Sequence, residues 1–201
     1  MSGRVNTKRA LVIGGTRGIG AAVTDTLIDR GWAVTATGRE HFNLGQPTTW
    51  EAWRNILPGE SAFGLVVFCA GVLDPEPWSS KSWDAYARSY VVHALGPVRF
   101  LARYKDDLFP WWTRVVFVSS VGAVNAGAVD LGYGMAKAAL EKAARALAEH
   151  ESWRITLVRL DLVDTGMLRQ LPVDSLHGRA VLTPGEAAGD ILRQAQVPGQ
   201  Y

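Results

Sequence analysis

Apolar residues along the chain fall into two kinds of run. Short runs rich in Val, Ile and Leu have the length of buried strands, and longer segments between them repeat apolar residues at helical spacing. The strand-like runs are ALVIG (10–14), WAVTATG (32–38), GLVVFCAG (64–71), RVVFVSS (114–120) and WRITLVRL (153–160). The helix-like segments are 18–31, about 82–104 and about 133–150. This alternation indicates βαβ units, and therefore a doubly wound α/β fold with a parallel sheet covered on both faces.

Two segments near the C-terminal end of the chain follow the last predicted strand and are not part of this alternation. A last helix is predicted over 184–194, because Thr183 can cap it, Pro184 suits its first position and Glu186 can complete a capping box. Residues 161–183 lack a clear period and are long for a plain connection, so we expect a substrate lid there. No repeat or linker divides the chain, and its length predicts one domain, residues 1–201.

Composition narrows the class of protein. Apolar residues make up 48% of the chain and charged residues 20%, which are ordinary globular values. Because 21 basic side chains nearly cancel 19 acidic ones, we expect no nucleic-acid partner. No apolar run approaches the roughly 20 residues of a membrane span, and the first apolar run is too short for a signal peptide. The lone Cys69 excludes an intrachain disulfide and a cysteine-built metal site, so a cytoplasmic protein without metal is predicted.

A glycine-rich loop, GGTRGIG (14–20), lies between the first predicted strand and the first predicted helix. Main-chain N–H groups and the helix dipole can hold a pyrophosphate there, and glycines remove the side chains that would obstruct it. The alternative is a plain tight turn. The place of this loop in a βαβ unit favours a dinucleotide-binding site over a plain turn.

The end of the second strand bears on the choice of cofactor. Thr37, Gly38 and Arg39 stand where NAD-binding proteins place a carboxylate on the ribose hydroxyls. Arg39 can pair with a 2′-phosphate, and Arg17 adds a second positive charge, so NADP(H) is expected over NAD(H). The alternative is that both arginines are simply solvated.

Tyr133 and Lys137 stand four residues apart in YGMAK, so both face one side of the predicted helix. Ser120 ends a predicted strand, at the edge where open parallel sheets bind ligands. With GGTRGIG, CAG (69–71) and VDTGM (163–167), these residues make the sequence resemble the short-chain dehydrogenase/reductase family over nearly its whole length. The resemblance implies a Rossmann-type fold and an NADP(H)-dependent carbonyl reductase acting on a small molecule.

The resemblance also implies a role for each central residue. Tyr133 would be the general acid, Ser120 would donate to the substrate carbonyl oxygen, and Lys137 would bind the nicotinamide ribose. Free tyrosine has a pKa near 10, so we expect Lys137 to favour the phenolate. Taken singly, each residue has an alternative as a cap, a packing residue or a solvated charge.

Other family positions extend the predicted site. Thr165 matches the position that contacts the nicotinamide carboxamide, and Asn43 stands where an Asp usually lies near the adenine. The predicted cofactor-binding residues are Gly14, Thr16, Arg17, Gly18, Ile19, Gly20, Arg39, Asn43, Leu44, Cys69, Ala70, Gly71, Tyr133, Lys137 and Thr165.

Three positions depart from the family pattern. His93 replaces an Asn that helps to hold a water in the proton relay; it could serve the relay with a pKa near 6.5, or be a packed helix residue. We include it among the catalytic candidates. Cys69 replaces the Asn of the usual NAG, and Leu160-Asp161 replaces a Pro-Gly pair, which puts a carboxylate near the nicotinamide.

The family also implies an assembly. Its members usually continue through a further strand, so six full strands are expected here. A homodimer is predicted through the two long helices, whose small residues Ala136, Ala139, Ala143 and Ala144 would allow close approach; the alternative is ordinary core packing. A different class of function also stays open, a non-catalytic NADP(H)-binding regulatory or interaction protein on the same fold.

Overall fold

The computed structural model describes residues 8–40, 42–56, 62–127, 130–172 and 179–197. Five parallel strands form the central sheet, in the order β2-β1-β3-β4-β5. Their bounds are β1 (Arg9–Ile13), β2 (Ala33–Thr37), β3 (Leu65–Phe68), β4 (Arg114–Ser120) and β5 (Arg154–Leu160). β6 (Leu162–Val163) and β7 (Val181–Leu182) pair separately as a small two-stranded sheet. The predicted fold class is confirmed, with a Rossmann-like sheet.

The expected number of strands was wrong, because the described residues form a central sheet of five strands rather than six. Between β2 and the next helix the chain turns instead of extending. Asn43 Oδ1 accepts from the Gly45 N–H at 2.9 Å, and the Gln46 N–H donates to the Asn43 carbonyl at 2.9 Å. These local hydrogen bonds compete with a strand ladder, and Pro47 then begins a helix.

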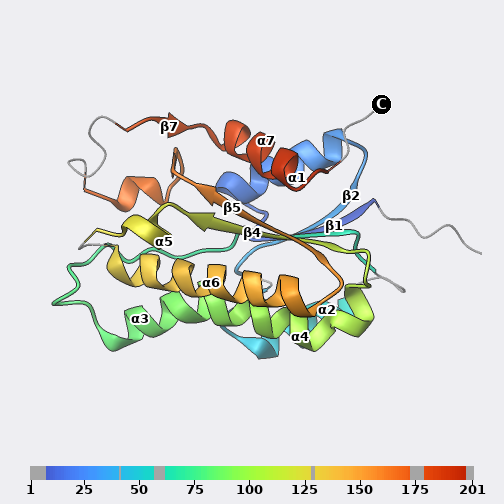
Figure 1. The fold of residues 1–201 in the computed structure, drawn as a ribbon, viewed down its shortest axis with the longest axis horizontal. Helices are drawn as coiled ribbons and strands as arrows, with labels where there is room; N and C mark the ends of the chain where they lie inside the picture. The colour runs from blue at the N-terminus through green and yellow to red at the C-terminus, as the bar shows by residue number, and fades with distance from the viewer. Residues whose placement is uncertain (1–7, 41, 57–61, 128–129, 173–178, 198–201) are drawn as a thin grey trace, which may run out of the picture.

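Helices cover both faces of the sheet (Figure 1). The first face carries α1 (Gly18–Asp29) and α7 (Pro184–Gln194). The other face carries α2 (Pro47–Ile56), α3 (Trp83–Tyr90), α4 (Gly96–Leu108) and α6 (Leu131–His150), and the short α5 (Gly122–Asn125) precedes α6. In β1, Leu11 and Ile13 pack into one core while Ala10 and Val12 pack into the other. Within the described residues no helix is long and apolar enough to cross a membrane.

The long helix expected over 82–104 is interrupted by a π-helical turn, η1 (Val91–Leu95). Pro97 has no N–H and its ring clashes with the carbonyl four residues back, that of His93. The Gly96 N–H instead donates to the Val91 carbonyl, five residues back. The wider turn places His93, with 2% of its surface exposed, in the interior beside the site described below.

The last helix begins as predicted. Thr183 Oγ1 accepts from the Glu186 N–H at 3.2 Å, and Glu186 Oε2 accepts from the Thr183 N–H at 2.7 Å. This capping box confirms the start of α7. Part of the expected lid, residues 173–178, lies outside the described residues; the described part contains a 3-10 turn, η2 (Leu168–Gln170).

Candidate active site

A cavity of about 1010 Å³ lies at the carboxyl ends of the strands. Gly14 follows β1, Gly38 follows β2, Cys69 follows β3, Ser120 ends β4 and Asp161 follows β5, and all five line this cavity. The fold therefore brings together residues that are far apart in the chain. The sequence-predicted residues that line it are Gly14, Thr16, Arg17, Gly18, Ile19, Gly20, Arg39, Asn43, Leu44, Cys69, Ala70, Gly71, His93, Ser120, Tyr133, Lys137 and Thr165.

The glycine-rich loop has a conformation that larger residues would disturb. Gly14 and Gly18 have positive φ angles of 82° and 55°. A Cβ on Gly14 would lie 2.6 Å from the Ala70 backbone, and one on Gly18 would lie 3.3 Å from Thr165 Cγ2. Because α1 begins at Gly18, the positive end of its dipole lies at the cavity wall. The loop is therefore suited to an anionic group such as a pyrophosphate.

Two cations and one carboxylate stand at the β2 end of the cavity. Arg17 and Arg39 are exposed, and neither forms an ion pair with a described residue. The Glu40 carboxylate packs over the backbone of Gly38, a neighbour of Arg39. Asn43 Oδ1 already accepts a hydrogen bond from the Gly45 N–H in the turn described above. Two guanidinium groups, those of Arg17 and Arg39, therefore line this cavity.

Ser120 and Tyr133 meet in the interior of the cavity. Ser120 Oγ accepts from the Gly122 N–H at 3.1 Å and forms a hydrogen bond with the Tyr133 side chain. Burial raises the pKa of Tyr133 to about 12, the hydrogen bond with Ser120 lowers it, and the nearby carboxylate of Asp130 raises it further. At neutral pH Tyr133 is therefore a neutral phenol, a form that can donate a proton.

Lys137 is buried behind Tyr133. Its Nζ donates to the Val118 carbonyl at 2.7 Å and lies 5.6 Å from the centre of the Tyr133 ring. Burial lowers the pKa of Lys137 to about 8, against the opposing effects of Cys69 and Glu141. The sequence led us to expect that Lys137 favours the Tyr133 phenolate. In this arrangement burial dominates, and the phenol is less acidic than free tyrosine.

His93 packs directly on the catalytic candidate Tyr133. Their rings meet edge to face with centroids 5.0 Å apart. His93 Nε2 lies 2.7 Å from the Val72 carbonyl oxygen and 3.1 Å from the Val72 backbone nitrogen, so it donates to the first or accepts from the second according to the tautomer. Nδ1 has no hydrogen-bond partner among the described residues. Burial first, and then the Lys137 charge, lower the pKa of His93 to about 3, although the Val72 hydrogen bond raises it.

The expected titration of His93 near neutral pH is therefore wrong. A buried imidazole beside a buried ammonium group stays neutral. The neutral ring can still donate or accept one hydrogen bond at Nδ1, according to the tautomer. Gly71 makes room for it, since a Cβ there would lie 2.7 Å from His93 Cε1.

Cys69 follows β3 and packs against the core on one side of the sheet. Burial raises the pKa of its thiol to about 12, although Lys137 opposes this effect. The thiol is therefore protonated and unreactive at neutral pH. Asp161, also singled out in the sequence, forms an ion pair with Arg179, and both residues line the cavity.

One buried carboxylate near the site was missed from the sequence. Glu141 stands four residues after Lys137 on α6, and 4% of its surface is exposed. Its Oε1 accepts from Ser119 Oγ at 2.9 Å and from Arg159 Nε at 2.7 Å. The signal available in the sequence was its spacing, since residues 133, 137 and 141 share one helix face.

Comparisons with known proteins agree with this architecture. Residues 61–188 match the family model described as enoyl-(acyl carrier protein) reductase. The uncharacterized oxidoreductase YvaG of Bacillus subtilis (strain 168) is 24% identical over 163 residues, which are 71% of this chain and 62% of that protein. This chain therefore spans less than two thirds of the length of that relative.

Solved structures share the fold at low sequence identity. An alcohol dehydrogenase from the archaeon Thermococcus sibiricus, complexed with 5-hydroxy-NADP, has a TM-score of 0.78 and 20% identity, over 94% of this chain and 91% of that chain. The angucycline C-6 ketoreductase LanV with bound NADP has a TM-score of 0.70 and 22% identity, over 93% and 88%. Because the family model matches more than half of the chain, the protein belongs to the short-chain dehydrogenase/reductase family.

Proposed function

We propose that this protein is an NADPH-dependent oxidoreductase that reduces a ketone or aldehyde to an alcohol, with Tyr133 as the proton donor. The observation that carries the proposal is the grouping of Tyr133, Ser120 and Lys137 in the cavity that also holds the glycine-rich loop. The Tyr133 ring centre lies 5.6 Å from Lys137 Nζ, and a Cβ on Gly122 would lie 3.5 Å from both Ser120 Oγ and Tyr133 Cε1. A pure binding site has no need of a phenol, a hydroxyl and an ammonium group at one point.

The described residues fit an NADP(H) cofactor. The loop lacks a Cβ at Gly14 and Gly18, where one would fill the space beside Ala70 or Thr165. Arg17 and Arg39 can pair with a 2′-phosphate, and together they outweigh the single carboxylate of Glu40. The Thermococcus sibiricus alcohol dehydrogenase and LanV, both solved with an NADP-type cofactor, support this choice.

The cofactor, when bound, would supply the hydride to the carbonyl carbon. Ser120 would hold the carbonyl oxygen through a hydrogen bond, and Tyr133 would transfer its proton to that oxygen. A phenol with a pKa of about 12 keeps its proton until charge develops on the acceptor. The Lys137 ammonium would then stabilise the phenolate left behind and would hold the ribose hydroxyls. His93 would take part in the relay through a hydrogen bond at Nδ1.

The assembly we propose is a homodimer through the α3–α4 and α6 layer. Two of the small residues expected at the contact, Ala136 and Ala144, are instead buried in the core of the monomer, with 0% and 2% of their surface exposed. Large apolar side chains that remain exposed on this layer are Trp83, Tyr90, Leu95 and Met135. They provide the apolar surface that a stable dimer would bury.

A non-catalytic NADP(H)-binding protein is the second candidate. It is favoured by the departures at His93, Cys69 and Asp161, all of which line the cavity. Such a protein would bind NADPH through the same loop and arginines but would turn over no carbonyl compound. Turnover therefore separates the two functions.

The experiment mixes the purified protein with NADPH and a panel of aldehydes and ketones, and follows the loss of reduced-nicotinamide absorbance. Turnover is expected in the wild-type protein. Tyr133→Phe should lose it while the NADPH dissociation constant stays within a factor of about two, because the ring is kept and the acid is removed. If Tyr133→Phe retains most of the activity, the proton donor is misassigned.

A binding arm of the same experiment tests the cofactor. The wild-type protein should bind NADPH at least about tenfold more tightly than NADH, which corresponds to roughly 1.4 kcal/mol. Arg39→Asp should abolish this preference, and Glu40→Gln, which removes the opposing charge, should increase it. Equal affinity for both cofactors in the wild-type protein would contradict the choice of NADP(H).

A further inference from the structure

Glu141 is buried in a polar cluster that the proposed reaction does not use directly and that opens to solvent at Arg159, whose side chain is 40% exposed. The cluster joins three elements: Glu141 from α6, Ser119 from β4 and Arg159 from β5. Arg159 donates through Nε at 2.7 Å and through Nη2 at 2.5 Å to the two carboxylate oxygens of Glu141. Such a two-pronged contact fixes both the position and the plane of the carboxylate.

The position of this cluster matters because of the strand register. Ser119 of β4 stands opposite Arg159 of β5, and the next residue of β4 is Ser120. Glu141 therefore ties α6 to the residue that directly precedes Ser120. On the same face of α6 stand Lys137, one turn earlier, and Tyr133, two turns earlier. The contact holds the helix that carries the acid against the strand that carries its partner.

The charge of Glu141 also acts on Lys137, which stands one helical turn earlier on α6. The titratable groups that face Lys137 are Cys69 after β3, His93 on η1, and Tyr133 and Glu141 on α6. Cys69 and Tyr133 are protonated, and His93 is neutral, at neutral pH. Glu141 is the group in this set that is ionised with negative charge, because its hydrogen bonds with Arg159 lower its pKa.

We propose that Glu141 is a positioning residue of the active site, which locks α6 in register with β4 and β5 and places a carboxylate one helical turn from the buried Lys137 ammonium group. The inference adds a positioning residue to the proposed reduction. It rests on that proposal for the role of Lys137, which would stabilise the Tyr133 phenolate and hold the ribose hydroxyls. Arg159 sets the strength of the effect, because its guanidinium partly neutralises the carboxylate. Arg145, a second arginine near Glu141, is more distant at 3.7 Å and its side chain is 65% exposed.

The test measures the pKa of Lys137 directly, by NMR titration of protein labelled with ¹³C at lysine Cε, with Lys137→Arg used to assign the signal. Glu141→Gln keeps a hydrogen-bond acceptor but removes the charge, so the pKa of Lys137 should fall by about half a unit or more. Arg159→Gln leaves the Glu141 charge uncompensated, so the pKa should rise. Arg145→Gln is the matched control and should leave it within about 0.2 units.

Shifts of opposite sign in Glu141→Gln and Arg159→Gln support the proposal, since a purely structural role would disturb Lys137 in the same direction in both variants. Shifts of the same sign, or no shift in either, would overturn it. The alkaline limb of kcat/KM should move with the measured pKa. The NMR measurement needs neither cofactor nor turnover, so it tests the role of Glu141 independently of the proposed function. The proposed function itself fails if the wild-type protein neither binds NADPH nor consumes it with any carbonyl compound.

Discussion

At the scale of single residues, burial sets the protonation states in this site. It raises the pKa of Tyr133 to about 12, lowers that of Lys137 to about 8 and lowers that of His93 to about 3. Each shift favours the neutral form. The ammonium group of Lys137 is therefore present at neutral pH against a desolvation cost, which the hydrogen bond to Val118 and the charge of Glu141 offset in part.

This cost predicts a pH-dependent stability. The pKa of Lys137 is lowered from 10.5 to about 8 in the folded state, so between these values the unfolded chain binds more protons than the folded one. The penalty is fully present below about pH 8 and is relieved as pH rises through 10.5. It amounts to roughly 3 kcal/mol.

Lys137→Met removes the charge and keeps the volume. At about pH 7 the variant should therefore have a larger free energy of unfolding than the wild-type protein. This difference should shrink by about 2–3 kcal/mol between about pH 7 and about pH 10. Urea unfolding of both proteins at the two pH values measures this, and the contributions of groups that do not interact with Lys137 cancel in the difference. An advantage that does not change with pH would mean that Lys137 keeps its ordinary pKa.

At the scale of elements, the sequence predicted the strands well because each is a short run rich in apolar residues, although β2 and β5 are only partly buried. β4 and α7 have the predicted bounds. α2 was missed because Trp50 and Trp53, which pack into the core, lie in a segment that is otherwise polar. The π-turn was missed because periodicity alone does not show how Pro97 rearranges the hydrogen bonds around His93.

The packing of α5 against α6 leads to a prediction about Gly134. In a helix interior, Gly→Ala usually stabilises by about 0.5–1 kcal/mol. Here a Cβ would lie 2.3 Å from Ala126 Cβ and 2.5 Å from the Gly122 carbonyl oxygen, so α5 and α6 would have to separate. Gly134→Ala should therefore destabilise the protein by about 1–3 kcal/mol and displace Tyr133, reducing turnover.

Gly189 in α7 provides the matched control, because a Cβ there meets nothing within 4 Å. Gly189→Ala should stabilise by about 0.5–1 kcal/mol and leave turnover unchanged. Thermal unfolding and steady-state rates of the two variants make the comparison. If both substitutions stabilise equally, the close contact of α5 with α6 does not constrain the active site.

At the scale of the whole molecule, the sequence predicted which residues share the cavity but not the contacts that hold them. Gly14, Ser120 and Tyr133 could be placed together because parallel strands end at one edge of the sheet. The contact of Glu141 with Arg159 joins α6 to β5 and depends on the exact depth of packing, which residue spacing does not give. That residues 1–201 form a single domain stays a prediction.

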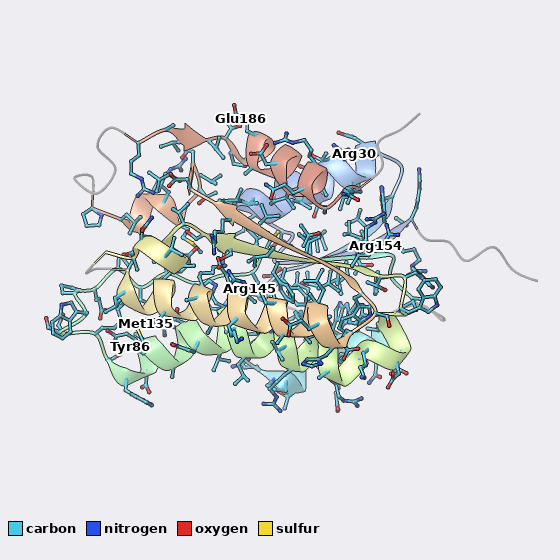
Figure 2. All side chains as sticks on the ribbon, viewed as in Figure 1. Arg30, Tyr86, Met135, Arg145, Arg154 and Glu186 are labelled. Carbon is cyan, nitrogen blue, oxygen red and sulfur yellow. The ribbon has the colours of Figure 1, made fainter. Side chains whose placement is uncertain are left out.

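The outer face of the helical layer leads to the last prediction. Met135 on α6 and Tyr86 on the neighbouring α3 lie close together in the view of Figure 2. Met135 is 42% exposed and Leu95 is 49% exposed, although both are large and apolar. A stable dimer buries about 800 Å² on each partner, and a two-fold axis brings each residue of the interface into it twice. A carboxylate at position 135 would therefore enter an apolar interface in two copies.

The wild-type protein should sediment as a dimer, and Met135→Glu should sediment as a monomer with an unchanged circular dichroism spectrum. Ile28→Glu is the control, since Ile28 is 54% exposed on α1, on the opposite side of the sheet (Figure 1). It should remain a dimer. Sedimentation velocity over a range of concentrations distinguishes these outcomes. A monomeric wild-type protein would contradict the proposed dimer. If Ile28→Glu dissociates the dimer while Met135→Glu does not, the contact lies on the α1 side of the molecule instead.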